Sequence, residues 1–167
     1  MSRLSSTVVE STQDDTISVV DTVLSLDDAT KAVASPKAGA TSLFVGTTRN
    51  HFEGKPVVRL EYEAYVPMAV KEIRKVIEAA RDRWDLIRVA VYHRTGVVPV
   101  GESSIIIAAS SAHRKEAMNA VQFLIDTIKA SVPIWKKEIY EDGTKWKANK
   151  EATARRSQDD DDAGDGG

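Results

Sequence analysis

The strongest constraint on the fold is a helix pattern that lies between a buried strand and a proline. Residues 103–110 read SSIIIAAS, a short apolar run that predicts a buried strand. From about Ala112 to Ala130, apolar residues recur at the three- and four-residue spacing of a helix with one buried face: Ala117, Val121, Leu124, Ile125 and Ile128. Pro133 disfavours helical geometry at Val132 and so ends the helix. The segment predicts a strand followed by a helix that packs on one side.

Strand and helix patterns also alternate through the rest of the chain. We predict further strands over 16–24, 39–50, 57–65 and 87–96, and further helices over 25–35 and from Pro67 to about Trp84. Alternation within the third of these strands puts one set of side chains on a common face: Val58, Leu60, Tyr62 and Ala64. Residues 96–102, GVVPVGE, read as a turn-rich connection.

The dipeptide Asp142-Gly143 near the end of the chain is a strong hairpin signal. Together these elements predict an α+β fold with a mixed or antiparallel sheet, two main helices and a C-terminal hairpin.

Charge is distributed unevenly along the 167 residues. Counted as Lys and Arg against Asp and Glu, residues 35–150 carry +6, and the segments before and after them carry −4 each, which gives the net charge of −2. We predict a flexible N-terminal extension over 1–14, a single domain over 15–150 and a disordered acidic tail over 151–167. A basic domain of this size favours an anionic small ligand or an acidic protein partner.

Several classes of protein are disfavoured by the composition. The chain has no cysteine, which removes disulfides, thiolate metal sites and cysteine nucleophiles, and makes the cytoplasm the expected location. No apolar run approaches the roughly 20 residues of a membrane helix. The three histidines have no metal-ligand spacing. No nucleic-acid-binding signature occurs, so we expect no nucleic acid as partner. From the observations above we also expect no membrane as partner, and no metal or other cofactor.

Cationic residues gather instead around the two ends of the 112–130 helix. Ser110 to Arg114 leave the strand and enter the helix, which is the setting of an anion site or of an ordinary helix cap with two exposed basic residues. Lys129 lies in the last turn, where a lysine either meets a ligand or only complements the helix dipole. In an extended segment Lys136 shares the face of Ile134, so it points inward if Ile134 does; in the other register Trp135 is buried and Lys136 is solvated.

A further candidate follows the predicted strand 39–50. Arg49 and Asn50 come directly after the apolar residues SLFVG, at a loop end where sites tend to collect. The forked guanidinium of Arg49 suits a phosphate, and a solvated loop arginine is an equal alternative.

Four segments together resemble the large, catalytic subunit of the molybdopterin synthase family: GATSLFVGTTRNH (39–51), YHRTGVVPVGE (92–102), residues 110–138 and EDGTKWKAN (141–149). The most specific part is the order Ser-Ala-His-Arg, then Lys129, then Pro-Ile-Trp-Lys-Lys-Glu. The resemblance covers roughly residues 16–150 in order.

The resemblance implies an α/β-hammerhead fold, α+β in class, and a sulfurtransferase in molybdenum cofactor biosynthesis. Such an enzyme converts cyclic pyranopterin monophosphate into molybdopterin by installing two dithiolene sulfurs. The sulfur arrives as a thiocarboxylate on the C-terminal Gly-Gly of a separate ubiquitin-like small subunit. The large subunits form a homodimer within a heterotetramer. A chain without cysteine cannot carry the sulfur as its own persulfide, which agrees with sulfur on a partner.

The resemblance also implies a set of site residues. The substrate pocket is expected to use Thr47, Thr48, Arg49, His113, Arg114, Lys129, Lys136, Lys137 and Glu138. We assign catalysis to Lys129 and Lys136, as general acid or base or as stabilisers of an oxyanion. Arg49, His113 and Arg114 are expected to bind phosphate, and Glu138 to orient a lysine.

Three questions stay open on the sequence. A non-catalytic module that docks a ubiquitin-like protein would need the carrier groove but not Lys129, Lys136 and His113 together. His113 and Arg114 could serve a pocket of their own chain or of the opposite subunit. The Gly-Gly end of this chain resembles the end of a ubiquitin-like carrier, but a solvated tail is the favoured interpretation.

Overall fold

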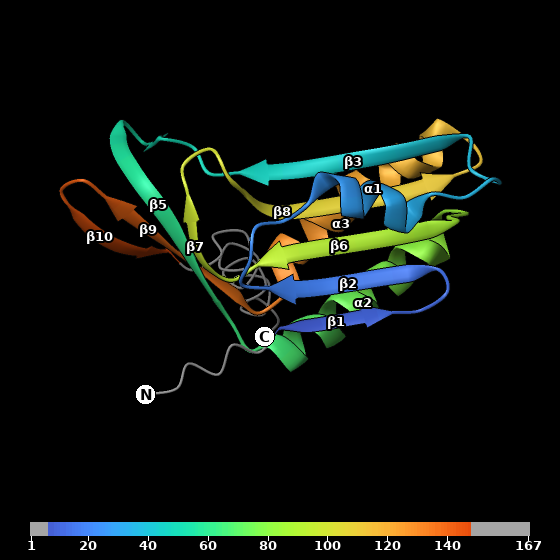
Figure 1. Cartoon of the computed structure of the whole chain (residues 1–167), viewed down its shortest axis with the longest axis horizontal. Coiled ribbons are helices and arrows are strands. Elements are labelled where there is room, and N and C mark those ends of the chain that lie inside the picture. Colours follow the sequence, from blue (N-terminus) through green and yellow to red (C-terminus); the bar gives the residue numbers. More distant parts are fainter. Residues whose placement is uncertain (1–6, 148–167) are drawn as a thin grey trace, which may run out of the picture.

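The described part of the chain, residues 7–147 of a computed structural model, forms two sheets and three helices (Figure 1). The larger sheet has the order β1-β2-β6-β8-β3, in which only β2 and β6 run parallel. Its strands are β1 (Val8–Ser11), β2 (Asp15–Val20), β3 (Ala40–Thr47), β6 (Arg88–Arg94) and β8 (Ser103–Ser111). The predicted mixed sheet is confirmed.

The second sheet stands at one end of the first and has the order β10-β9-β5-β4, with β7 also paired to β5 (Figure 1). Its strands are β4 (His51–Phe52), β5 (Lys55–Ala64), β7 (Gly96–Pro99), β9 (Ile134–Tyr140) and β10 (Gly143–Lys147). The hairpin predicted at Asp142-Gly143 is the β9–β10 hairpin.

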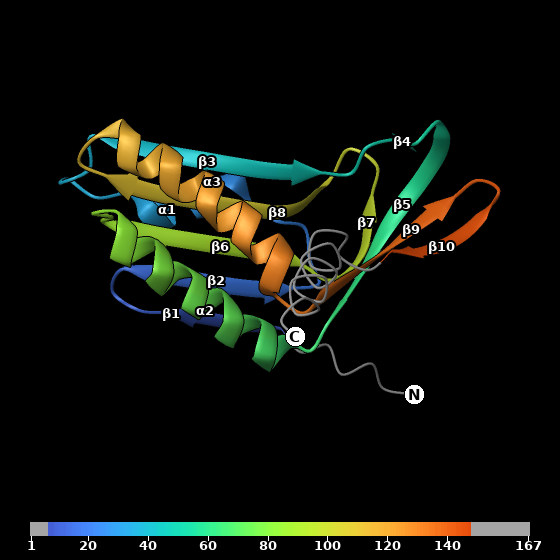
Figure 2. The same ribbon diagram turned by 180° about the vertical axis from the view of Figure 1, so that it is seen from behind.

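Two long helices cover one face of the larger sheet, and a short one covers the other (Figures 1 and 2). α2 (Val66–Arg83) and α3 (Arg114–Ser131) lie side by side, and α1 (Leu26–Val33) packs on the opposite face. Every apolar residue predicted for the buried stripe of α3 is buried. α3 ends where the sequence predicts, because Val132 before Pro133 is extended.

The main core lies between the larger sheet and the two long helices. Strand residues such as Ile17, Val91 and Ile107 meet helix residues such as Ile73 and Leu124, all at 0% exposure. Burying branched side chains of this kind contributes roughly 1.5–3 kcal/mol each. No helix of the described residues has the length and apolar character needed to cross a bilayer.

Three local predictions need correction. Part of the expected flexible extension 1–14 is a strand: β1 pairs with β2, and Thr12 closes the turn by accepting a hydrogen bond from the backbone N–H of Asp15 (3.0 Å). Residues 1–6 and the acidic tail 151–167 lie outside the described residues.

The second correction concerns the 96–102 connection, which contains strand β7, because Val97 and Val98 find free hydrogen-bonding groups along β5. In β5 itself Val57 is buried and Val58 is exposed, the reverse of the prediction for Val58. An irregularity of pairing between Val57 and Arg59 shifts the alternation there, while Leu60 and Tyr62 keep their common face.

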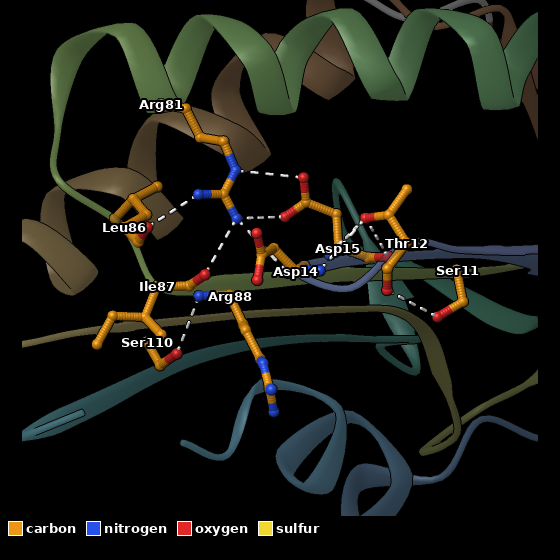
Figure 3. A network of polar contacts seen from close by, with 9 residues as sticks. All are labelled: Ser11, Thr12, Asp14, Asp15, Arg81, Leu86, Ile87, Arg88 and Ser110. Atoms are coloured by element: carbon orange, nitrogen blue, oxygen red, sulfur yellow. Dashed lines mark hydrogen bonds and ion pairs between the residues drawn. The ribbon is translucent and has the colours of Figure 1, made fainter. Parts of the chain in front are cut away.

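Arg81 joins α2 to the larger sheet through a fork of hydrogen bonds (Figure 3). Its Nε and Nη2 donate to the two carboxylate oxygens of Asp15 on β2, at 3.2 and 2.5 Å. Nη1 donates to the carbonyl of Leu86 at 2.8 Å, and Nη2 also reaches the carbonyl of Ile87 at 3.3 Å. The pair is mostly buried, with side chains 27% and 15% exposed.

We expect Arg81→Ala to lower the free energy of unfolding by about 3 kcal/mol, because it leaves the Asp15 carboxylate and two carbonyls without their donor. Urea denaturation followed by circular dichroism measures this. The matched control is Lys75→Ala on the same helix, whose exposed pair with Glu72 should be worth about 0.5 kcal/mol or less. Equal losses in the two variants would contradict this account of Arg81.

Candidate functional site

A cavity of about 500 Å³ opens where the end of the larger sheet meets the second sheet and the last turns of α3. Its walls come from β3, β4, β5, β6, β8, α3 and β9, together with the loops after β3 and after α3. Figure 2 shows the C-terminal end of α3 beside the start of β9, at this junction. The cavity is therefore assembled from segments that are far apart in the sequence.

The face of β9 that lines the cavity carries Ile134, Lys136 and Glu138. Trp135, between the first two, is 46% exposed. The interpretation with Ile134 inward is thus the correct one, and Lys136 points to the cavity with a side chain 43% exposed. Lys137 alternates to the other face of β9 and does not line the cavity; its Cα lies opposite that of Glu61 on β5.

Glu138 is a buried carboxylate in the cavity wall, 3% exposed. The hydroxyl of Tyr140 donates a hydrogen bond to its Oε2, and the Nζ atom of Lys136 lies 3.8 Å from its Oε1. A buried carboxylate is costly unless such partners are present. These contacts hold the Glu138 carboxylate beside the Lys136 ammonium. This is the placement expected of a residue that orients a lysine.

Two more cations reach the cavity from other elements. Lys129 lines it from the last turn of α3, next to the buried Ile128, and is itself exposed. Arg49 enters from the loop after β3, with its guanidinium carbon 5.9 Å from the centre of the Phe52 ring. Thr47 at the end of β3 completes this part of the lining. The described chain thus brings Arg49, Lys129 and Lys136 to one cavity.

Thr48 does not line the cavity but holds the loop that carries Arg49. Its side chain is buried, with Oγ1 3.5 Å from the carbonyl of Val98. Its N–H donates to the carbonyl of Glu102 at 3.0 Å, and its carbonyl accepts from the N–H of Gly101 at 2.9 Å. Thr48 therefore ties the β3–β4 loop to the turn before β8.

His113 and Arg114 lie at the other end of α3 from the cavity (Figure 2). His113 is the N-cap residue, without a side-chain cap bond, and both side chains are exposed. Fifteen residues of helix separate Arg114 from Lys129, which is roughly 22 Å at 1.5 Å per residue. Within one chain, the two basic ends of this helix do not meet.

Comparisons with known proteins agree with this geometry. The family model described as MoaE protein matches residues 19–131. The chain belongs to the MoaE protein family. The molybdopterin synthase catalytic subunit of Homo sapiens is 57% identical over 143 residues, which cover 86% of this chain and 76% of the human protein. The resemblance seen in the sequence is confirmed, and with it the coarser function: a molybdopterin synthase catalytic subunit, an enzyme of molybdenum cofactor synthesis.

Solved structures of the MoaE family share the fold. Molybdopterin synthase from Staphylococcus aureus superposes with a TM-score of 0.74 at 36% identity, covering 77% of this chain and 94% of that one. A Helicobacter pylori chain, solved as a complex of subunits 1 and 2 of molybdopterin-converting factor, gives 0.65 at 22% identity, over 78% of this chain and 88% of that one. The second likeness concerns the fold alone.

In this MoaE family member, the residues of the cavity's inner wall were not predicted from the sequence. Phe44, Tyr62, His93 and Ser104 line it from four different strands. The Tyr62 and His93 rings make an edge contact, with centroids 5.1 Å apart at 75°. Burial raises the pKa of Tyr62, so its phenol stays protonated. His93 lies within YHRTG, a segment that carried the resemblance, but nothing local marked it as part of a site.

No group of three or more His, Cys, Asp or Glu residues that could hold a metal ion occurs in residues 7–147. The cavity's chemistry is that of cations beside neutral polar groups and one buried carboxylate. Such a site can bind an anion, stabilise an oxyanion and transfer protons.

Burial lowers the pKa of His93 from 6.5 to about 4. The unfolded chain therefore binds a proton at this residue, between pH 6.5 and 4, that the folded chain does not. Above pH 6.5 this difference does not affect the free energy of unfolding. As the pH falls from 6.5 toward 4, the free energy of unfolding decreases by up to about 3 kcal/mol. Urea denaturation at a series of pH values should show a shallower loss for His93→Gln than for the unchanged chain. Parallel pH profiles would contradict the buried neutral histidine.

Proposed function

We propose that this chain transfers sulfur to cyclic pyranopterin monophosphate to form the dithiolene of molybdopterin. The sulfur donor is the C-terminal thiocarboxylate of a ubiquitin-like small subunit whose Gly-Gly tail enters the cavity. The observation that carries the proposal is the convergence of Arg49, Lys129 and Lys136 on one cavity, in a chain without cysteine. Both the phosphate of the substrate and the thiocarboxylate are anions, and such a site neutralises them.

In the proposed reaction, the thiocarboxylate sulfur forms a bond to a carbon of the pterin side chain while a carbon–oxygen bond at the same carbon breaks. The departing oxygen leaves as water after protonation, or stays on the phosphate as one of its oxygens. The carrier is then an acyl thioester of the pterin. Water then attacks the acyl carbon, and the bond from that carbon to sulfur breaks. Sulfur stays on the pterin, and the carrier leaves as a carboxylate. Two such transfers give the dithiolene.

The lysines have roles that follow from this sequence of bonds. The tetrahedral intermediate of thioester hydrolysis carries an oxyanion, which an ammonium group in a partly enclosed cavity stabilises. Lys129 and Lys136 approach the cavity from α3 and β9, so one can face the acyl group while the other faces the pterin. The carboxylate of Glu138 holds the Lys136 ammonium near its position through their 3.8 Å contact.

We propose that His113 and Arg114 complete the phosphate site of a second copy of the chain. Their distance from the cavity of their own chain, roughly 22 Å along α3, supports this arrangement. In a twofold homodimer each copy gives these two residues and receives the same pair. With a small subunit bound to each copy, the assembly is a heterotetramer. The proposed location is the cytoplasm, as expected from the sequence.

The alternative is a docking module that binds the ubiquitin-like protein without chemistry. Such a module needs a groove for an extended tail but no buried carboxylate positioned beside a lysine. The placement of Glu138, with Tyr140 and Lys136 as its partners, favours the enzyme.

Single-turnover assays test the catalytic roles. The protein is mixed with cyclic pyranopterin monophosphate and a small subunit that carries a C-terminal thiocarboxylate, and dithiolene product is measured as its oxidised fluorescent derivative. Lys129→Ala and Lys136→Ala should each slow product formation about 100-fold or more, because each removes a charge that acts on the transition state.

The small subunit should bind both lysine variants within about threefold of the unchanged chain, because we expect most of its contact to lie outside the cavity. Lys137→Ala, one position from Lys136 but on the other face of β9, is the matched control and should lose much less activity. Normal turnover in the lysine variants would remove them from the mechanism.

A mixed dimer tests the shared site. One copy carries Lys129→Ala and Lys136→Ala, the other carries His113→Ala and Arg114→Ala, and two affinity tags isolate the dimer that holds one of each. One of its two cavities then has every residue intact, so the mixed dimer should regain about half the activity of the unchanged dimer. Activity no higher than that of the parent variants would contradict the sharing of these residues between two copies.

A further inference from the structure

His93 offers the cavity a hydrogen-bond acceptor that the proposed reaction does not use. The residue lies on β6, lines the cavity and is 6% exposed. Its Nδ1 is 2.9 Å from the carbonyl oxygen of Arg94. A carbonyl oxygen can only accept a hydrogen bond, so Nδ1 carries the ring proton and Nε2 keeps its lone pair.

The surroundings of His93 hold this neutral form in place. The edge contact with Tyr62 restricts the ring plane, and Ile105 is the partner of His93 on β8. Burial opposes a second proton on the ring. No described residue makes a hydrogen bond to Nε2 of His93. A hydrogen-bond acceptor fixed in a cavity wall is suited to a ligand that carries a hydrogen-bond donor.

The two parts of the cavity differ in what they can bind. Arg49, Lys129 and Lys136 carry positive charge, and the first two are exposed. Next to His93, by contrast, lie neutral side chains: its ring contacts Tyr62, and Ile105 is its partner on β8. The carboxylate of Glu138 also acts on Tyr62. A lone pair repels phosphate oxygens and attracts N–H groups. The cavity therefore offers cations to an anion and, beside His93, an aromatic surface and hydrogen-bond acceptors to a heterocycle.

We propose that Nε2 of His93 accepts a hydrogen bond from an N–H group of the pterin. The bond would orient the substrate with its heterocycle against the inner wall and its phosphate toward the cations. The inference rests on the proposed function, because it takes the pterin as the substrate. It makes His93 a residue that determines specificity for an N–H-bearing ring, separate from the groups that bind phosphate or act on sulfur.

Equilibrium binding to the intact protein tests this assignment, with cyclic pyranopterin monophosphate as the probe and isothermal calorimetry as the readout. His93→Phe keeps a flat ring but has no acceptor, so it should weaken binding about 10-fold or more, because a donor on the ligand is left without a partner. His93→Gln places an amide oxygen near the position of Nε2 and should restore affinity to within about threefold.

Inorganic phosphate serves as the second probe, as a competitor of the substrate. Its inhibition constant should be the same for the unchanged chain, His93→Phe and His93→Gln, and should rise for Lys129→Ala. Substrate affinity that is unchanged in His93→Phe would overturn the inference. Equal weakening in the Phe and Gln variants, with phosphate binding also reduced, would indicate a structural role for His93 and overturn it as well.

A measurement on the unchanged chain covers the case in which a variant does not fold. In ¹⁵N NMR spectra, the Nε2 resonance of His93 should move upfield when the substrate is added and stay in place when inorganic phosphate is added. No movement with bound substrate would refute the hydrogen bond. If the unchanged chain binds no pterin at all, the proposed function fails first; if it binds pterin with His93 unaffected, only this inference fails.

Discussion

The site depends on the direction in which β9 presents its side chains. Strand side chains alternate, so the packing of Ile134 on the core sends Lys136 and Glu138 to the same side, into the cavity wall. The seven-residue pairing of β9 with β5 fixes this register, and it sets Leu60 and Tyr62 on the adjacent strand beside the same cavity. A slip of one residue would expose Lys136 and bury Trp135 and Lys137, with no carboxylate at the cavity.

The rest of the structure supplies what β9 lacks. α3 ends at the cavity because Pro133 stops it there, and this brings Lys129 to the same cavity as Lys136. Thr48 ties the loop of Arg49 to the turn before β8 by hydrogen bonds. The third cationic side chain is therefore carried by an anchored loop. The same helix carries His113 and Arg114 away from the cavity. A helix 18 residues long cannot bring both ends to one pocket, and for this reason we propose that a second copy of the chain supplies that pair.

Local patterns in the sequence predicted much of this fold. The stripe of α3, the hairpin at Asp142-Gly143 and the short helix predicted over 25–35 are all confirmed. The Ser25 hydroxyl caps this last helix by accepting a hydrogen bond from the N–H of Asp28. Strand β1 was missed because it is short and mostly exposed, so it carries little apolar alternation even though its partner β2 is next in sequence. Strand β7 was missed because it is short and pairs with the distant strand β5. His93 was missed for a related reason: its role depends on the strands packed around it. The resemblance to a known family identified the charged site residues. It did not show which of them line one cavity within a single chain.

The most direct test of the account is a crystal structure of this protein with cyclic pyranopterin monophosphate bound. The account predicts substrate density in the cavity between α3 and β9, with Lys129 and Lys136 within hydrogen-bond distance of the ligand and His113 and Arg114 of a second copy at its phosphate. Density at a different surface, or a phosphate held at the start of α3 with the cavity vacant, would contradict the claim that this cavity is where sulfur transfer takes place.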